Sequence, residues 1–215
     1  MLHKSVLLLA PISLAMASPL LAESYEFKTI NPYSSVETSA RGINNDGDVV
    51  GDFADSTQSA AGTELGFKYD DGKYKKISFP GARDTDANGI NHEGVIVGTY
   101  DTNSGDHGYV LDEGNYIALP DPPNQNGFPD FNAINDEGEI VGVLSPGTNV
   151  SGNRGFLFSY GNYTVLDCGN FQTEANGIND QGDIVGECAD ANFTEHAFLL
   201  HDGVYTILDF PGSKG

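Results

Sequence analysis

One phrase occurs four times in this chain, and the repetition constrains the fold more than any other feature. Each copy has an I-N pair, a short turn that ends in glycine, and an aliphatic run: RGINNDGDVVGD, NGINHEGVIVGT, NAINDEGEIVGV and NGINDQGDIVGE. The asparagines of the four pairs lie 47, 44 and 44 residues apart, at Asn44, Asn91, Asn135 and Asn179. Four copies at this period indicate a repeat architecture.

Each copy predicts four short antiparallel strands. The first ends at the I-N pair, the second is the aliphatic run, and the third and fourth flank a second glycine turn, as in GFKYDDGKYKKI and GFLFSYGNYTVL. Regular glycine turns between alternating, aromatic-rich runs are typical of antiparallel β structure. The repeat cores cover approximately 37–82, 84–123, 128–170 and 172–212.

Units of four strands and about 44 residues have the size of β-propeller blades. We therefore predict an all-β propeller of four blades. An incomplete fifth blade stays open, because the segment from Tyr25 also matches a fourth strand and gives seventeen strands where four blades need sixteen. A β-solenoid or a stacked-sheet array is the alternative.

The N-terminus reads as a secretory signal peptide. Lys4 precedes the short apolar run VLLLAPISLAMA, and small residues permit cleavage after Ala17 or Ala22. No second hydrophobic segment follows, so no membrane span is predicted. We expect residues 1–22 to be removed and residues 23–215 to form a single repeat domain that is secreted or periplasmic.

The repeat resembles a known family. The pattern I-N-x-x-G-x-[IV]-V-G, followed by HGYVL from His107 and HAFLL from His196, is similar to the bacterial extracellular HAF-repeat proteins. The resemblance implies export and a repeated β structure, and it brings no catalytic residues. Leu65 and Arg154 stand at the histidine position in the other two copies, which argues against a shared histidine ligand.

Charge and motifs narrow the function. The net charge of −21 disfavours nucleic acid and anionic membranes as partners. No G-x-S-x-G, Walker or H-E-x-x-H motif occurs. We predict an exported, non-enzymatic binding module for an extracellular glycan, cation or protein. It would present loops that differ between copies, at 54–66, 100–106, 120–131 and 144–153. The alternative is a small secreted hydrolase of glycan type with an acidic central site.

A candidate site lies five residues before each repeat asparagine, at Ser39, Asp86, Asp130 and Glu174. The first strand of a propeller blade is the innermost, so these side chains would form an acidic mouth on the axis. A ring of oxygen ligands suits a hard cation, and we predict Ca²⁺ on Asp86, Asp130 and Glu174. The alternative is that these acids point into solvent at the ends of loops.

Two further predictions concern asparagine and cysteine. Each repeat asparagine is expected to cap its own turn by accepting backbone N–H groups, rather than to bind a ligand. Cys168 and Cys188 replace apolar residues of other copies on two strands that meet at one blade junction. Together with export, this predicts a disulfide bond between them.

Overall fold

The computed structural model describes residues 26–54, 63–123, 127–146, 152–169, 172–209 and 211–212. The predicted signal peptide lies outside these residues, as do most of the loop segment 54–66, half of 144–153 and part of 120–131. Among the described residues, no helix is long and apolar enough to cross a membrane.

Sixteen strands in the described chain form four antiparallel sheets of four, and within each sheet the strands follow chain order. The prediction of an all-β chain with four four-stranded blades is therefore confirmed. Blade 1 contains β1 (Thr38–Ile43), β2 (Val49–Ala54), β3 (Glu64–Asp70) and β4 (Lys73–Ile77), and blade 2 contains β5 (Asp84–Ile90), β6 (Ile96–Thr102), β7 (Gly105–Asp112) and β8 (Asn115–Ala118). Blade 3 contains β9 (Gly127–Ile134), β10 (Ile140–Pro146), β11 (Arg154–Ser159) and β12 (Asn162–Leu166), and blade 4 contains β13 (Gln172–Ile178), β14 (Ile184–Ala189), β15 (Glu195–His201) and β16 (Val204–Ile207).

The glycine after each aliphatic pair is required by close contact inside the blade. A Cβ atom built on Gly142 of β10 would lie 2.0 Å from the backbone oxygen of Asp130 on β9. Gly51, Gly98 and Gly186 meet the same obstacle at 1.9 Å. The glycine that follows the valine in each repeat therefore stands where the first and second strands approach too closely for any side chain.

Each first strand carries a bulge at one repeat position. The register between the first and second strands shifts at Arg41, Asn88, Asn132 and Asn176. A bulge redirects the side chain of the extra residue. Asn88 and Asn132 donate from Nδ2 to backbone oxygens of the next blade, those of Phe131 at 3.0 Å and Ala175 at 2.9 Å.

Apolar clusters hold successive blades together. Val50 of blade 1 packs with Ala87, Ile90 and Tyr109 of blade 2. Equivalent clusters, centred on Val97 and Val141, join blade 2 to blade 3 and blade 3 to blade 4. All three valines are fully buried, so the junctions between blades form the hydrophobic core.

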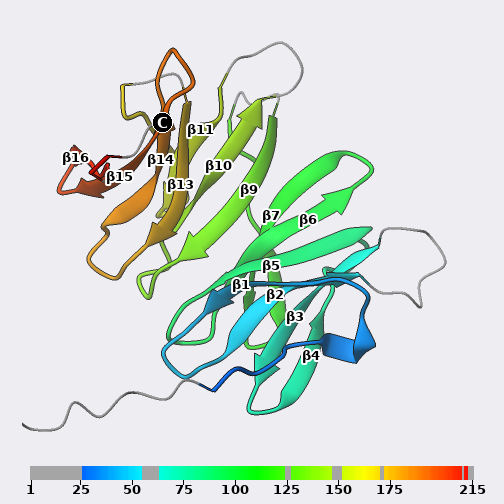
Figure 1. The fold of residues 1–215 in the computed structure, drawn as a ribbon. Coiled ribbons are helices and arrows are strands. Elements are labelled where there is room, and N and C mark those ends of the chain that lie inside the picture. Colours follow the sequence, from blue (N-terminus) through cyan, green and yellow to red (C-terminus); the bar gives the residue numbers. More distant parts are fainter. Residues whose placement is uncertain are drawn as a thin grey trace, which may run out of the picture.

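The blades follow one another in an arc. Figure 1 shows blade 1 in blue and cyan at one end and blade 4 in orange and red at the other. Extensive contacts link β2 to β5, β6 to β9 and β10 to β13, and within the described chain no comparable contact joins blade 4 to blade 1. The first strands also contact each other in order, which places them on the inner side of the arc.

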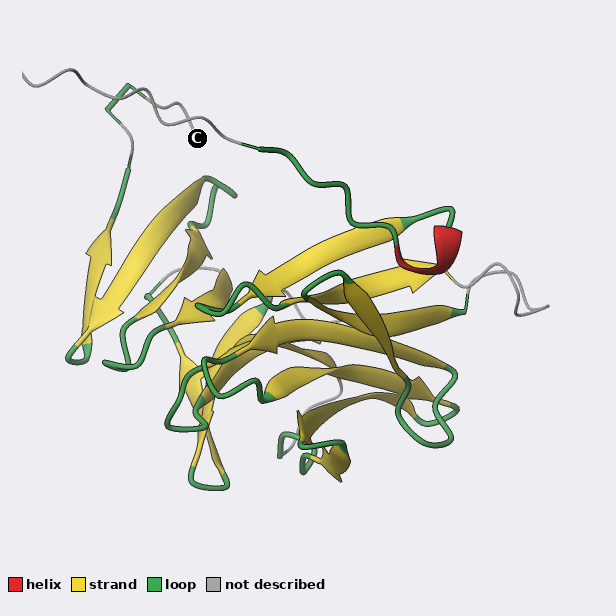
Figure 2. Cartoon of the chain, turned by 90° about the horizontal axis from the view of Figure 1, so that it is seen from below, coloured by secondary structure: helices red, strands yellow, loops and turns green. Residues whose placement is uncertain are grey.

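The segment 26–36 covers part of the free side of blade 1. Its short 3₁₀ helix, η1 (Pro32–Ser34), lies beside the strands of this blade in Figure 2. Ile30 packs on the cluster that contains Phe53 and Phe67, and the backbone N–H of Asn31 donates to Tyr74 Oη at 2.9 Å. At the next junction the N–H of Ser78 donates to Tyr116 Oη. The segment therefore stands where the end of a preceding fourth strand would lie, but it is not a strand itself.

The predicted disulfide is confirmed. Cys168 follows β12 of blade 3 and Cys188 lies on β14 of blade 4; their sulfur atoms are bonded and their Cα atoms lie 6.5 Å apart. The bond fastens blade 4 to blade 3 next to the apolar cluster that contains Val141.

Candidate functional site

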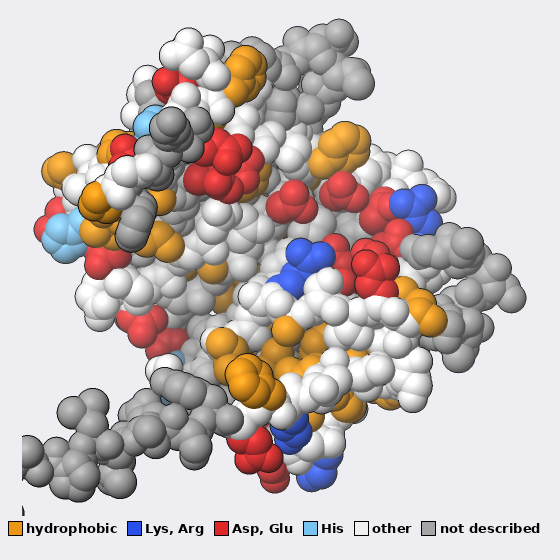
Figure 3. All heavy atoms as spheres, in the orientation of Figure 1, with side chains coloured by type: hydrophobic (Ala, Val, Ile, Leu, Met, Phe, Trp, Pro, Cys, Tyr) orange, Lys and Arg blue, Asp and Glu red, His pale blue; other side chains and the backbone are white. Residues whose placement is uncertain are grey.

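The inner strands have two ends of different character. At the first, called the loop end, β1, β5, β9 and β13 begin and the second strands finish. At the other, called the turn end, lie the four N-x-x-G turns. Figure 3 shows acidic side chains in a band across the middle of one face of the molecule, with basic side chains in two places along it.

The four predicted mouth residues occupy one repeat position on the inner strands. The residue that pairs with each across the first hairpin differs from blade to blade: Ser39 with Asp52, Asp86 with Thr99, Asp130 with Val143, and Glu174 with Glu187. The four residues therefore lie on β1, β5, β9 and β13, opposite different partners.

Three carboxylates gather at the loop end, and only one was predicted. Asp52 of β2, Glu64 of β3 and Asp86 of β5 offer oxygen atoms that all lie within 4.8 Å of one another. Asp52 is buried, and Oδ1 of Asp86 is buried without a hydrogen-bond partner among the described residues. We call these three residues the carboxylate triad.

Asp130 and Glu174 are not part of the carboxylate triad. Asp130 acts on the triad through its charge, which adds to the raised pKa of Asp86. The pKa of Asp130 is itself raised, first by burial, then by the charge of Asp106 and to a smaller extent by that of Glu174. Glu174 accepts a hydrogen bond from Asn153 Nδ2. The single cation ring on Asp86, Asp130 and Glu174, completed by Ser39, stays a prediction.

Arg41 is the basic residue that pairs with the carboxylate triad. It occupies the bulge position that is asparagine in the other three blades, and its Nε donates to Asp52 Oδ1 in an ion pair. The bulge thus turns a guanidinium toward the carboxylate triad. Arg41 also lowers the pKa of Asp86, but it does not outweigh the other influences.

Asp86 has an unusual protonation equilibrium. Burial raises the pKa of its carboxyl group to about 7, and the charges of Asp52, Glu64 and Asp130 add to the effect. The pKa of Glu64 is raised as well, first by burial and then by Asp52 and Asp84. Close carboxylates that lack enough positive charge either hold a proton or bind a cation. The triad is therefore suited to a proton at low pH and a hard cation at higher pH.

Sequence reasoning missed Asp52, Glu64 and Arg41. The signal for Asp52 was available, because the N-x-x-G hairpin sets a register that pairs it with Ser39. Arg41 could have been noticed as the one departure from asparagine at its repeat position. Glu64 gave no such signal, since it enters the site from a strand that follows a loop of variable length.

The repeat asparagines form a hydrogen-bonded ladder at the turn end. Asn44 Oδ1 accepts the backbone N–H groups of Asp46 and Asp48, which confirms the predicted cap. In addition, each Nδ2 donates to the backbone oxygen of the next repeat asparagine: Asn44 to Asn91 at 3.2 Å, Asn91 to Asn135 at 3.2 Å and Asn135 to Asn179 at 3.1 Å. The turns of all four blades line one hollow of about 230 Å³, which places them around a common axis and favours a propeller over a solenoid.

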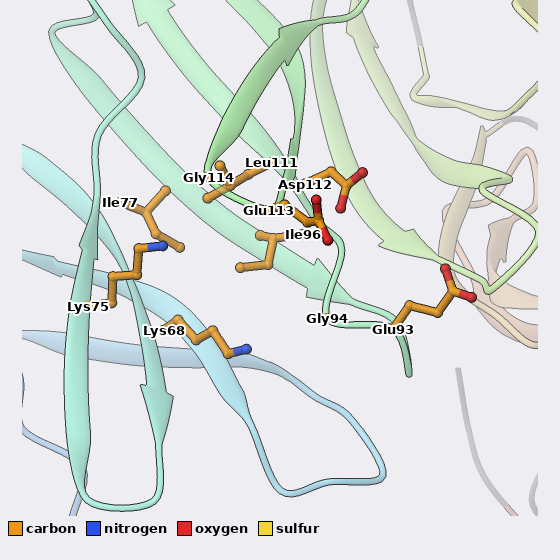
Figure 4. A pocket seen from close by; sticks show the side chains of 10 residues that line it. All are labelled: Lys68, Lys75, Ile77, Glu93, Gly94, Ile96, Leu111, Asp112, Glu113 and Gly114. Atoms are coloured by element: carbon orange, nitrogen blue, oxygen red, sulfur yellow. The ribbon is translucent and has the colours of Figure 1, made fainter.

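A second hollow, also of about 230 Å³, lies between blades 1 and 2 (Figure 4). Lys68 and Lys75 of blade 1 face acidic residues of blade 2 across an apolar floor. Lys68 Nζ is already paired with Asp48 at 2.7 Å. The lining residues are Lys68, Lys75, Ile77, Glu93, Gly94, Ile96, Leu111, Asp112, Glu113 and Gly114.

The histidines of the HAF-like motifs pair with carboxylates. His107 Nδ1 lies 2.7 Å from Asp121 Oδ1, and His196 Nδ1 lies 2.8 Å from Asp209 Oδ1. Both aspartates follow the fourth strand of the same blade. The two histidines therefore tie the end of each of these blades to its third strand.

Comparison with known proteins supports the fold alone. No family model and no curated protein matches the chain. Among solved structures, TolB from Acinetobacter baumannii has a TM-score of 0.59 at 11% identity, over 80% of this chain and 43% of that one. The β-propeller domain of the Trilobed protease from Pyrococcus furiosus, described as having an open velcro topology, gives 0.54 at 14%, over 77% and 50%.

The acylaminoacyl peptidase of Pyrococcus horikoshii gives a TM-score of 0.53 at 15% identity, over 77% of this chain and 26% of that one. The chain thus spans half or less of each of these three solved chains. Together with the four sheets around one axis, these matches define the class of fold: a β-propeller.

Proposed function

We propose that the protein is an exported, non-enzymatic binding module that takes a hard divalent cation, Ca²⁺ in the first place, at the carboxylate triad. The observation that carries this proposal is the meeting of three carboxylates within 4.8 Å, one of them with a buried oxygen that has no hydrogen-bond partner in the described part of the chain. Oxygen ligands at this density are what Ca²⁺ requires, and the ion would relieve the repulsion among Asp52, Glu64 and Asp86.

The position of the triad connects the cation to a larger ligand. Asp52 stands near the end of β2 and Glu64 begins β3, so the variable segment 54–66 joins two of the three ligands. An ion held here would fix the two ends of that segment and present its own open coordination positions beside it. Glycans and acidic protein surfaces both offer oxygens for such positions, which fits the extracellular ligand classes predicted from sequence.

Export is supported by chemistry as well as by the N-terminal sequence. A disulfide bond between Cys168 and Cys188 is stable in an oxidising compartment such as a periplasm or the extracellular space. The loss of residues 1–22 during secretion remains part of the proposal. N-terminal sequencing of the secreted chain would show whether it begins at Ser18 or Glu23.

Thermal unfolding with Ca²⁺, Mg²⁺ or EDTA tests the cation site. A ligand of the folded state at a hundred times its Kd stabilises by about 2.7 kcal/mol, so Ca²⁺ should raise the Tm of the exported protein and EDTA should reverse the rise. Asp86→Asn should abolish the response. Arg41→Gln should strengthen it, because the competing guanidinium is gone. A Tm that is indifferent to Ca²⁺ in both wild type and Arg41→Gln would contradict the site.

Asp130→Asn separates the triad from the predicted ring. If the cation sits on Asp52, Glu64 and Asp86, loss of the Asp130 carboxylate should weaken the response only modestly through charge. If the ring of Asp86, Asp130 and Glu174 holds the ion, Asp130→Asn should abolish the response as completely as Asp86→Asn.

One observation favours a hydrolase as second candidate. The carboxyl group of Asp86, with its pKa of about 7, lies close to the carboxylate of Asp52, and a protonated acid beside an ionised one is the pair that glycoside hydrolysis uses. Chromogenic glycosides give the test: turnover that Asp86→Asn and Asp52→Asn each abolish would establish an enzyme.

A further inference from the structure

The side of blade 4 that points away from blade 3 is uncovered. Val50, Val97 and Val141 share one repeat position and are fully buried by the next blade, whereas Val185 at the same position is 46% exposed. Leu208 is likewise exposed, although its counterparts Ile77 and Leu166 are buried. We call this surface the trailing face of blade 4. It is built like the three covered faces but has nothing on it among the described residues.

The opposite end of the arc carries the matching half of a junction. Ile90 and Ile134 pack against the preceding blade and are buried, whereas Ile43 of blade 1 is 68% exposed. We call the surface around Ile43, Asn44 and Asn45 the leading face of blade 1. The segment 26–36 covers the outer part of this blade near Tyr74, and the inner part stays open.

The hydrogen-bonding groups of the two faces are complementary. Between blades 2 and 3, Asn91 Nδ2 donates to the oxygen of Asn135 and the N–H of His92 donates to Asp136 Oδ1. Between blades 3 and 4, the N–H of Asp136 donates to Asp180 Oδ1 in the same way. By repeat position, Asn179 Nδ2 and the Asp180 N–H are the next donors, and the Asn44 oxygen and Asn45 Oδ1 are the acceptors that would meet them.

The ladder therefore stops at Asn179. Its Nδ2 has no further repeat asparagine to reach among the described residues and bonds to Asp183 Oδ2 of its own turn instead, at 3.1 Å. Asn44, at the other end, donates across its junction as Asn91 and Asn135 do. Each internal junction contains a bond from the Nδ2 of one repeat asparagine to the backbone oxygen of the next. One end of the arc keeps the donor of such a bond, on Asn179, and the other end keeps the acceptor, on Asn44.

Charge separates the two ends as well. Residues 26–83 contain nine acids and seven Lys and Arg, for a net charge of −2; the cations are Lys28, Arg41, Lys68, Lys73, Lys75, Lys76 and Arg83. Residues 172–212 contain none, and they hold eight acids: Glu174, Asp180, Asp183, Glu187, Asp190, Glu195, Asp202 and Asp209. Residues 172–212, at a net charge of −8, therefore repel a second copy of themselves more strongly than they repel residues 26–83, so charge favours a contact between unlike ends of two chains over a contact between two trailing faces.

We propose that the trailing face of blade 4 binds the leading face of blade 1 in a second copy of the same chain. This head-to-tail contact repeats the internal junctions, with Val185 covered by Ile43 and the asparagine ladder continued from Asn179 to Asn44. A head-to-tail contact closes into a ring when the rotation between copies permits, and two arcs joined at both ends make a symmetric dimer.

The segment 26–36 competes with this contact. The N–H of Asn31 occupies Tyr74 Oη, the group that the chain following β16 of a second copy would reach by analogy with Ser78 and Tyr116. Full association therefore requires the segment to leave Tyr74. Tyr33→Ala should loosen the segment, because the Tyr33 ring packs at a tilt against Phe53 and its Oη donates to the backbone oxygen of Tyr74. The variant should therefore associate more tightly than wild type.

Analytical ultracentrifugation of the exported protein over a wide range of concentration tests the proposal. Wild type should associate, and Val185→Asp and Ile43→Asp should each weaken association at least tenfold. Both side chains are already exposed, so neither variant should fail to fold. Val165→Asp is the matched control: Val165 is as exposed as Val185 but lies outside the junctions, and its replacement should leave association unchanged.

A mixture of the two variants gives the decisive result. The Val185→Asp copy keeps an intact leading face and the Ile43→Asp copy keeps an intact trailing face. Mixed, they should form a one-to-one complex that contains one good junction and grows no further. Wild type that stays monomeric at every concentration, variants that fail to pair when mixed, or a Tyr33→Ala protein that associates no more tightly than wild type would each overturn the proposal.

Discussion

The turn end and the loop end of the inner strands are built from the same four repeats, yet they differ in kind. At the turn end every blade contributes the same asparagine, and the asparagines join into one ladder. At the loop end the equivalent positions hold serine, aspartate or glutamate, and an arginine replaces asparagine at one bulge. Residues that repeat hold the blades together, and residues that depart from the repeat build the candidate site.

The strongest test of this division is a repeated glycine. Gly142→Ala should lower the free energy of unfolding by about 3 kcal/mol or more, because the new Cβ would meet the Asp130 backbone oxygen at 2.0 Å. Gly138→Ala is the control, since that turn residue has open space and only its φ of 77° is unfavourable; it should cost about 1 kcal/mol. Urea unfolding measures both, and equal losses would contradict the close-contact explanation.

Removal of the disulfide bond should cause the next largest loss of stability. Cys168→Ala with Cys188→Ala opens a bridge between residues 20 apart in sequence and should cost roughly 3 kcal/mol, mainly by freeing the unfolded chain. Reductant should destabilise wild type by a similar amount and leave the double variant unchanged. If the double variant unfolds at the urea concentration of wild type, the bond contributes nothing to the junction of blades 3 and 4.

Asparagines in the middle of the ladder should contribute more to the free energy of unfolding than the asparagine at its end. Asn135→Ala removes a buried side chain that bonds to the Asn179 oxygen and accepts the Glu139 N–H, and it should cost about 2 kcal/mol. Asn179→Ala removes an exposed side chain that bonds only within its own turn among the described residues, and it should cost less than about 1 kcal/mol. Unfolding in urea that gives the reverse order would show that the ladder does not stabilise the blades.

Replacement of Asp86 should stabilise the protein, whereas the preceding substitutions destabilise it. The pKa of Asp86 is about 7 in the folded protein against 3.8 ordinarily, so the folded state binds the extra proton and loses stability as pH rises from about 4 to 7. Without divalent cations, Asp86→Asn should stabilise by on the order of 1–2 kcal/mol at pH 8, after allowance for solvent screening, and by little at pH 4. A loss of stability at pH 8 would show that the Asp86 carboxylate is already compensated there.

Much of this architecture is legible in the sequence, because the repeat encodes local chemistry. The N-x-x-G turn sets the hairpin, and the aliphatic run marks the buried second strand. The pairing of Cys168 with Cys188 followed from their repeat positions across one junction. Asp86 could be singled out because it stands at a fixed distance from the repeat asparagine, whereas the mouth of Ser39, Asp86, Asp130 and Glu174 as a whole stays a prediction.

The carboxylate triad was not predictable in the same way. Glu64 of blade 1 reaches Asp86 of blade 2, and this contact depends on how the two blades pack rather than on any local pattern. The asparagine ladder was missed for the same reason: capping is a property of one turn, whereas Asn91 also bonds to a carbonyl 44 residues away. Contacts between blades cannot be predicted from the sequence of a single repeat.

The bulge on each inner strand has a consequence for how such a protein is adapted. The four bulges are equivalent positions, and each directs one side chain away from the hydrogen-bond ladder of its own sheet. Asn88 and Asn132 use this position to bond to the next blade, Asn176 holds it in the last blade, and Arg41 uses it to pair with a carboxylate. A chain of this design acquires a new polar group near its axis by changing one letter, while the glycines, turns and valines that specify the fold stay as they are.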